Sequence, residues 1–239
     1  MAYAVYLKVN TESYQKFLAI QTALNTHSSA KQAHALGAVF AEVAVQIVQQ
    51  AFIELLEQQK RRIRLAHGYD IADDAEKVIA HVVNAIQKYL PWSIALLSNA
   101  RLKPVVDYFD AMIVPTSEQI FLKYNVDHAL VLKTNTAIEQ VQNGQRAAIQ
   151  DAFACLIQMI DLGVQQLIYQ PKQLLKFNLV VDKTLNGVIQ VCCNLAYKRL
   201  TQLGQEVGLD VAPFYIEHFL SFLDSESAFE CVQLTEKNP

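Results

Sequence analysis

Histidines and carboxylates are the side chains of this sequence from which a metal site could be built. Six histidines are present, but none stands in an HExxH sequence or in a Glu-x-x-His pair, the spacings with which helices bind zinc or a di-iron centre. Glu76 and His81 are five residues apart, so they project from different faces of a helix. The sequence therefore predicts no metal site and no cofactor.

Asp107 and Asp110 are the carboxylates whose spacing best suits acid–base chemistry, because residues three apart share a face of a helix. Together with His81, they are the residues that we expect to line a pocket if the chain binds a small molecule. His81 also stands among valines, which favours a histidine at the boundary of the core. Paired carboxylates acquire different pKa values only through burial, so the sequence assigns no catalytic residue.

The densest run of charge is Lys60-Arg61-Arg62-Ile63-Arg64. Arg61, Arg62 and Arg64 could contact a phosphate, an RNA or an acidic partner. They could equally be the solvated C-terminal end of a long helix, where cations complement the helix dipole, and we favour that interpretation. The net charge of −3 and the pI of about 6.1 argue against nucleic acid as the main ligand.

Motifs of nucleophilic catalysis and of phosphate binding are missing from the sequence. There is no GxSxG, no GxxxxGK[ST] and no GxGxxG, and the seven glycines are isolated from one another. The four cysteines form no CxxC pair, so we expect free thiols and a reducing, cytoplasmic location. These cysteines are Cys155, Cys192, Cys193 and Cys231.

The apolar pattern predicts a mainly α-helical protein, a multi-helix bundle with a minor β component. Residues 3–9 alternate with period two and predict a short strand, after which Thr11 caps a helix. A long helix is expected from Ala30 to Leu65, and another from Asp73 to Tyr89. Pro91 and Pro104 are each interpreted as first-turn prolines of following helices, and Pro115 with Thr116 and Ser117 is expected to start another short helix.

An internal repeat is suggested by the segments ALVLKTNT (129–136) and AVYLKVNT (4–11), which are identical at five of eight positions. QQAFIELLEQ (49–58) resembles residues 150–159, and VIAHVVNAIQKYL (78–90) resembles residues 188–200. We therefore predict a single domain over 1–239 with two related halves, about 1–125 and 126–239, each preceded by a short strand. Residues 4–10 and 129–135 are then expected to be neighbouring strands.

The leading functional hypothesis is a non-enzymatic helical protein that binds other proteins, as a subunit or an adaptor. It rests on the missing catalytic motifs, and the expected partner is another protein or a second copy in a homodimer. The alternative is a small-molecule-binding helical protein, or an enzyme, with a pocket between the two halves. Nucleic acid is disfavoured as a partner. No membrane span is expected, because charged residues interrupt every long apolar stretch.

Overall fold

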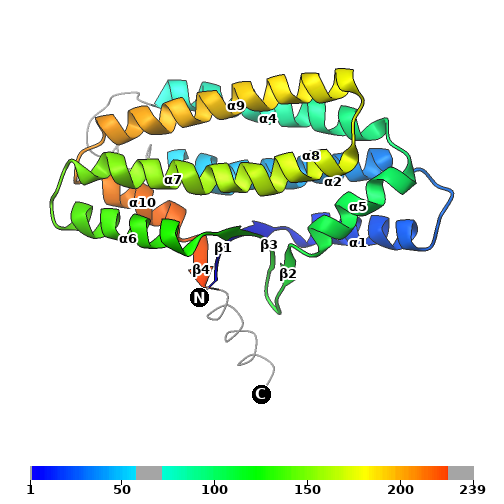
Figure 1. Ribbon diagram of the computed structural model, residues 1–239, viewed down its shortest axis with the longest axis horizontal. Helices are drawn as coiled ribbons and strands as arrows, with labels where there is room; N and C mark the ends of the chain where they lie inside the picture. The colour runs from blue at the N-terminus through cyan, green and yellow to red at the C-terminus, as the bar shows by residue number, and fades with distance from the viewer. Residues whose placement is uncertain (1, 58–71, 226–239) are drawn as a thin grey trace, which may run out of the picture. The chain divides into compact units, whose positions relative to one another are not determined.

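The computed structural model of the protein describes residues 2–57 and 72–225, with the side chains of residues 72–74 left aside (Figure 1). The fold is mainly helical with a small four-stranded sheet, as the sequence predicted. The described residues divide into two compact units. The larger unit contains residues 8–57, 72–122 and 170–193, and the smaller unit contains residues 2–7, 123–169 and 194–225.

Helix α2 (Ala33–Val48) is the central helix of the larger unit, since it packs against both α1 (Thr11–Asn25) and α4 (Ala72–Ala95). It continues into a π-helix, η1 (Gln49–Ile53). Helix α5 (Asn99–Asp110) packs against α1 and the short α8 (Gln170–Leu175).

The core of the larger unit is built from apolar residues at helical spacing, which gives each helix one buried face. Its buried members are Phe17, Ile20, Leu24, Ala33, Leu36, Val39, Ile94, Leu97, Leu102, Val105, Val106 and Leu175.

In the smaller unit, α7 (Ala148–Val164) packs against both α6 (His128–Gln142) and α10 (Ala212–Leu220). It too continues into a π-helix, η2 (Gln165–Tyr169). The long helix α9 (Leu179–Glu206) is uninterrupted, although its first residues belong to the larger unit and its last to the smaller.

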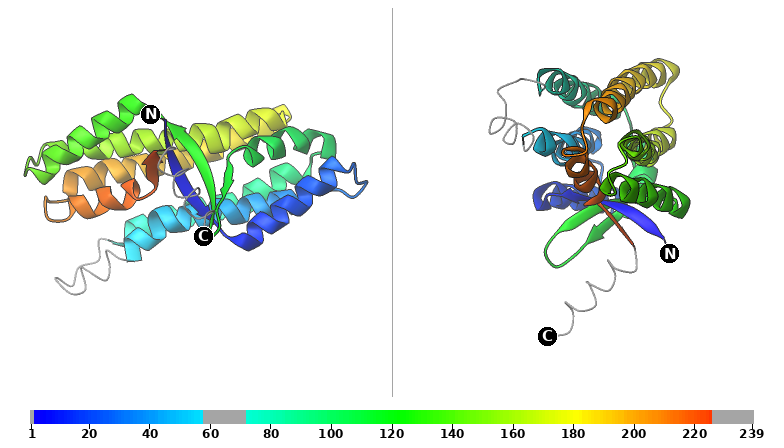
Figure 2. Two further views of the ribbon diagram at one scale, coloured as in Figure 1. Left: turned by 90° about the horizontal axis from the view of Figure 1, so that it is seen from below. Right: turned by 90° about the vertical axis from the view of Figure 1, so that its left-hand side faces the viewer.

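The sheet has the strand order β2-β3-β1-β4, with β1 at Tyr3–Val9, β2 at Ile113–Pro115, β3 at Ile120–Val126 and β4 at Leu223–Ser225. The outer pairs are antiparallel: β1 pairs with β4 and β2 pairs with β3. Figure 2 shows β1 and β3 side by side in this sheet. Strand β1 confirms the period-two prediction for residues 3–9.

The predicted strand at 129–136 is wrong, because these residues lie inside α6. Val131, Thr134, Ala137 and Val141 are buried at helical spacing, while Leu132, which the alternating pattern would bury, is 53% exposed. The neighbours of β1 in the sheet are β3 and β4. The strand nearest to the predicted position, β3, therefore ends before residue 129.

The three proline interpretations are also wrong. Pro91 lies inside α4, Pro104 lies inside α5, and Pro115 ends β2 instead of starting a helix. Pro91 is accommodated by close packing, because its backbone approaches α2 at Gly37, where there is no side chain. The expected long helix over 30–65 begins at Ala33 and runs through η1 to Glu57, and its remainder falls outside the described residues.

Two helical segments of the described chain, Ala33–Glu57 and Ala148–Leu175, are long and apolar enough to cross a membrane by length and composition. The core helix of a soluble protein meets the same criterion. In each segment 33% of the most apolar window is buried inside the protein. Length and composition alone therefore do not place either segment in a bilayer.

Candidate functional site

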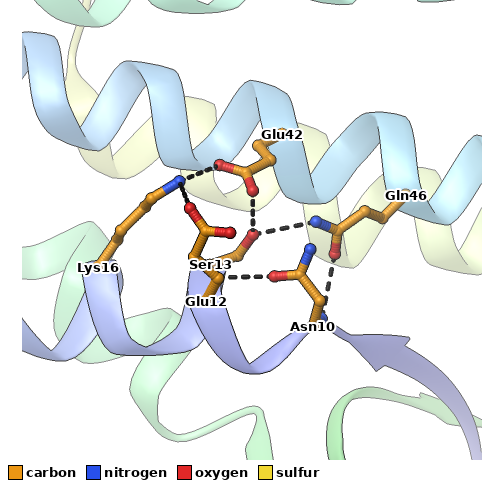
Figure 3. Close-up of polar contacts among 6 residues, drawn as sticks. All are labelled: Asn10, Glu12, Ser13, Lys16, Glu42 and Gln46. Atoms are coloured by element: carbon orange, nitrogen blue, oxygen red, sulfur yellow. Dashed lines mark hydrogen bonds and ion pairs between the residues drawn. The ribbon is translucent and has the colours of Figure 1, made fainter.

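A cluster of polar side chains joins α1 to α2 in the larger unit (Figure 3). At its centre is Ser13, whose hydroxyl donates to Glu42 Oε1 at 2.8 Å and accepts from Gln46 Nε2 at 3.0 Å. Asn10 caps α1 by accepting the Ser13 backbone N–H at 2.7 Å, and the Asn10 backbone N–H donates to Gln46 Oε1 at 3.2 Å. The cluster thus ties the start of α1 to the middle of α2.

Charged groups surround the Ser13 hydroxyl on the solvent side. Lys16 Nζ lies 3.1 Å from Glu42 Oε2 and 2.8 Å from Glu12 Oε1. The hydrogen bond from Ser13, together with that from Lys16, lowers the pKa of Glu42 against the opposing effect of desolvation. Hydrogen bonds to Glu12 and Glu42 raise the pKa of Lys16. At neutral pH the cluster therefore holds an ionised carboxylate and an ammonium group.

A serine beside a carboxylate and a lysine has the composition of a nucleophilic site, but its geometry argues against one. Ser13 is 0% exposed, so no substrate reaches its oxygen. Its hydroxyl is also already engaged as a donor to Glu42 and as an acceptor from Gln46. A nucleophile needs a free approach to the reacting atom. We therefore assign the cluster to attachment of α1 on α2.

A second kind of polar contact replaces missing strand partners in the sheet. The N–H of Tyr6 donates to the carbonyl of Phe222, next to β4. Lys8, two residues further along β1, points to the same side, but β4 does not extend far enough to pair with it. There the Gln50 side chain takes over: its Oε1 accepts the Lys8 N–H at 2.9 Å and its Nε2 donates to the Lys8 carbonyl at 3.0 Å. The amide of Gln50 therefore acts as one further peptide unit of a neighbouring strand.

The same contact occurs in the smaller unit. Gln166 Oε1 accepts the Asn125 N–H at 3.0 Å, and Gln166 Nε2 donates to the Asn125 carbonyl at 2.8 Å. Gln50 and Gln166 each lie in a π-helix, η1 and η2, at the end of an apolar helix. Short π-helices recur at positions where a particular side chain is presented.

These two glutamines were not singled out from the sequence. One sequence signal was present: Gln49-Gln50 and Gln165-Gln166 are both glutamine pairs followed by apolar residues. The earlier match of 49–58 to 150–159 obscured it, since η1 has its counterpart at 165–169.

The pocket residues predicted from the sequence, His81, Asp107 and Asp110, take no part in this cluster. Arg61, Arg62 and Arg64 lie outside the described residues. His81 is exposed on α4 and Asp110 is exposed at the end of α5. Asp107, also exposed, pairs with Lys103 at 2.9 Å, and Lys103 donates to Asn25 Oδ1 at 2.8 Å. The pocket around His81, Asp107 and Asp110 stays a prediction.

A surface depression of about 310 Å³ in the smaller unit contains none of the residues named from the sequence. Its lining residues are Arg146, Ala147, Ile149, Gln150, Gly204, Gln205 and Val207. Within residues 2–57 and 72–225, no group of three or more His, Cys, Asp or Glu is placed to hold a metal ion. Cys155, Cys192 and Cys193 are free thiols, and burial raises the pKa of Cys192.

Tyr215 is a buried polar residue that stands out in the smaller unit. It is 1% exposed, and its hydroxyl has no hydrogen-bond partner among the residues that the structure describes. Burial raises the pKa of Tyr215 to about 12, although the charge of Arg199 opposes the shift. The ring packs against Phe153, with 6.2 Å between centroids, so its role is that of a core residue.

No protein-family model matches this chain, and comparison with curated proteins and with solved structures gives no significant match.

Proposed function

We propose that this chain is a non-enzymatic protein that binds another protein, as a subunit or an adaptor. The observation that carries the proposal is the exposure of large apolar side chains on its helices and in the turn that follows α4. Leu179 is 69% exposed, Val180 73% and Leu96 61%. Single exposed apolar residues are ordinary on soluble proteins, but neighbouring ones are typical of contact surfaces.

The polar cluster around Ser13 supports the same proposal from another direction. It gathers a hydroxyl, a carboxylate and an ammonium group, yet its hydroxyl is closed to solvent and fully engaged. These polar groups therefore attach α1 to α2 and do not carry out a reaction, which is compatible with a protein that acts by binding another protein. We propose a cytoplasmic location, since the described cysteines are free thiols.

We also propose that the chain arose by duplication of a unit of strand, two helices, π-helix, long helix, short helix and strand. The support is the order of elements: β1, α1, α2, η1, α4, α5 and β2 are followed by β3, α6, α7, η2, α9, α10 and β4. Helical residues 54–57 follow η1 as α8 follows η2. The glutamine contacts to Lys8 and Asn125 also occur at corresponding places in this order.

The experiment for protein binding is purification of the tagged chain from cells that produce it naturally, after nuclease treatment. We expect a second protein at a fixed molar ratio, measured by native mass spectrometry of the purified complex, and absent from a tag-only control. A chain that purifies alone, and whose native mass is that of a monomer, would contradict the proposal.

A further inference from the structure

Hydrogen bonds bring three chain connections together at one end of the larger unit. Arg101, in the first turn of α5, donates through its guanidinium group to the backbone carbonyls of Leu175 and Lys176, where α8 ends. Asn99, the first residue of α5, accepts the backbone N–H of Gln32 at 2.9 Å, which attaches the connection between α1 and α2 to α5. The turn before α5, the connection between α8 and α9 and that between α1 and α2 therefore share this end (Figure 1).

This end carries the three most exposed of the large apolar side chains in the described part of the chain. Leu96 is 61% exposed in the turn that leads into α5, and Leu179 and Val180 are 69% and 73% exposed at the start of α9. The next residue, Val181, is buried, so the exposed pair lies on the solvent side of α9. Asn178 precedes the pair and caps the helix, because its Oδ1 accepts the Val181 N–H at 3.0 Å.

The same end of the larger unit carries a surplus of positive charge. Lys183 lies one turn into α9 on the face of the exposed pair, and Lys176 lies just before the helix; both are exposed. Arg101 is exposed too, and the carbonyls that it binds are neutral. The neighbouring acidic residue, Asp182, is already paired with Lys172. No aspartate or glutamate occurs in the segments 26–32, 96–103 and 176–181.

We call the surface formed by Leu96, Arg101, Lys176, Leu179, Val180 and Lys183 the basic end of the larger unit. Its apolar side chains gain free energy when they leave water, and its cations gain free energy beside carboxylates. Within residues 2–57 and 72–225, no acidic side chain forms an ion pair with these cations. A binding partner that offers both apolar and acidic groups is therefore complementary to this surface.

We propose that the basic end binds a segment of a partner protein in which apolar side chains are flanked by aspartate or glutamate. This inference rests on the proposed function and names the surface and the chemistry of the partner. Burial of Leu179 and Val180 supplies most of the affinity. The cations select an acidic segment and speed its approach.

Other anionic partners match this surface less well. Single-stranded nucleic acid is held by aromatic rings on which bases stack, and the exposed apolar side chains here are aliphatic. Anchoring to an anionic bilayer needs a long apolar helix face or a lipid chain beside the basic residues, and three side chains provide neither. The basic end of a second copy would bring like charges together.

The test uses the full chain and two labelled synthetic peptides with the same leucines and serines. One peptide carries glutamate at the positions where the other carries lysine. Fluorescence anisotropy at low salt should show about tenfold tighter binding of the glutamate peptide, because a few exposed ion pairs replace repulsions. At about 1 M salt, where the screening length falls to about 3 Å, most of this difference should vanish. Equal affinity at low salt, or binding of neither peptide, would overturn the inference.

Two double variants separate the charged and the apolar parts of the basic end. Lys176→Glu/Lys183→Glu should reverse the preference between the peptides. Leu179→Ser/Val180→Ser should weaken both complexes about tenfold or more, since it removes the side chains that become buried. Circular dichroism confirms that each variant is folded. If either folded variant bound both peptides as the wild-type chain does, the assignment of the surface would be wrong.

The matched control is Leu132→Ser/Lys133→Glu, which changes an exposed leucine and an exposed lysine of α6. It should leave the affinity for both peptides unaltered, and an effect as large as that at the basic end would contradict the inference. Vesicles containing phosphatidylserine and an RNA oligonucleotide are tested in parallel. Tighter binding of either one than of the glutamate peptide would assign the surface to another anion and overturn the choice of a protein.

The failure of this inference can be told apart from the failure of protein binding itself. If the tagged chain and Lys176→Glu/Lys183→Glu capture the same stoichiometric partner equally well, protein binding stands and the basic end is wrong. If neither captures a partner, protein binding fails too. A dimer of the wild-type chain in sedimentation that is lost in this variant would overturn the choice of a different protein as occupant.

Discussion

Glutamine side chains complete the hydrogen bonding of β1 and β3 at the points where their neighbouring strands have ended. Gln50 and Gln166 each offer one acceptor and one donor in the geometry of a peptide group, and each binds both polar groups of one strand residue. These hydrogen bonds fix the positions of the two apolar helices along β1 and β3.

Replacing either glutamine by leucine should lower the free energy of unfolding. We expect a loss of about 1 kcal/mol for Gln50→Leu and a similar loss for Gln166→Leu, because these hydrogen bonds are exposed and water replaces them in part. Urea unfolding followed by circular dichroism measures both. Gln49→Leu changes the exposed neighbour of Gln50 and is the matched control. A loss for Gln49→Leu as large as that for Gln50→Leu would contradict the assignment.

The Ser13 cluster makes stability depend on pH on the acid side. The pKa of Glu42 in the folded protein is lower than its ordinary value of 4.5, chiefly because Ser13 donates to it. Its stabilising effect is therefore present above pH 4.5 and is lost as the pH falls through the lowered pKa. Glu42→Gln should reduce the slope of unfolding free energy against pH below 4.5. An unchanged slope would show that Glu42 does not contribute.

The unpaired hydroxyl of Tyr215 gives a prediction of opposite sign. Tyr215→Phe removes a buried hydroxyl that has no partner within residues 2–57 and 72–225, so it should raise the free energy of unfolding by about 1 kcal/mol at pH 7. Because the folded pKa is raised to about 12 from an ordinary 10.0, stability is lost as the pH rises above 10, and the variant should lose less. Thermal unfolding at pH 7 and pH 10.5 measures both effects, and a destabilised variant would reveal a hidden partner of the hydroxyl.

At the scale of elements, the close approach of α2 and α4 depends on a glycine. A Cβ at Gly37 would lie 2.9 Å from the Cα of Pro91 and 3.2 Å from its carbonyl oxygen, so the backbone of α4 would have to move. Gly37→Ala should therefore destabilise the protein by about 1–3 kcal/mol in spite of the better helix propensity of alanine.

Gly187→Ala is the matched control, since a Cβ there meets nothing within 4 Å. It should stabilise the protein by about 0.5–1 kcal/mol through helix propensity alone. Differential scanning calorimetry of the two variants gives the comparison. If both Gly37→Ala and Gly187→Ala stabilised the protein, the contact between α2 and α4 at Gly37 would be less close than described.

The sequence predicted elements whose cause is local and missed those whose cause is tertiary. The alternation over 3–9 was recognised, and so was the helical spacing in α2 and α4. Strand β3 was missed, although its buried residues Leu122, Tyr124 and Val126 alternate. The likeness of 129–136 to 4–11 led us to predict the strand at 129–136 instead, and these residues form part of helix α6. Pro91 was misread, since the close approach of its backbone to Gly37 is a contact between two helices that no local pattern indicates.

The candidate site was harder to foresee than the fold. Ser13 and Glu42 are 29 residues apart, and Lys8 and Gln50 are 42 apart, so no short motif joins either pair. The contacts follow from the packing of α2 on α1 and on the sheet. A sequence indicates which residues can hydrogen-bond, but it does not indicate which backbone groups lack a strand partner.

At the scale of the whole molecule, one polar cluster is enclosed and several large apolar side chains are exposed. The Ser13 hydroxyl at the centre of the polar cluster is closed to solvent, whereas Leu179 and Val180 at the start of α9 are 69% and 73% exposed. On this basis we propose that the chain binds another protein.

Photo-cross-linking from the exposed apolar residues tests the proposal of protein binding most directly. A photoreactive amino acid replaces Val180, which is 73% exposed, in the tagged chain, and Leu132, 53% exposed on α6, is the control position. Irradiation of the cells that produce the protein, followed by mass spectrometry, identifies any adduct. The proposal predicts one dominant protein adduct at position 180 and none at position 132. The absence of a protein adduct at position 180 would contradict it.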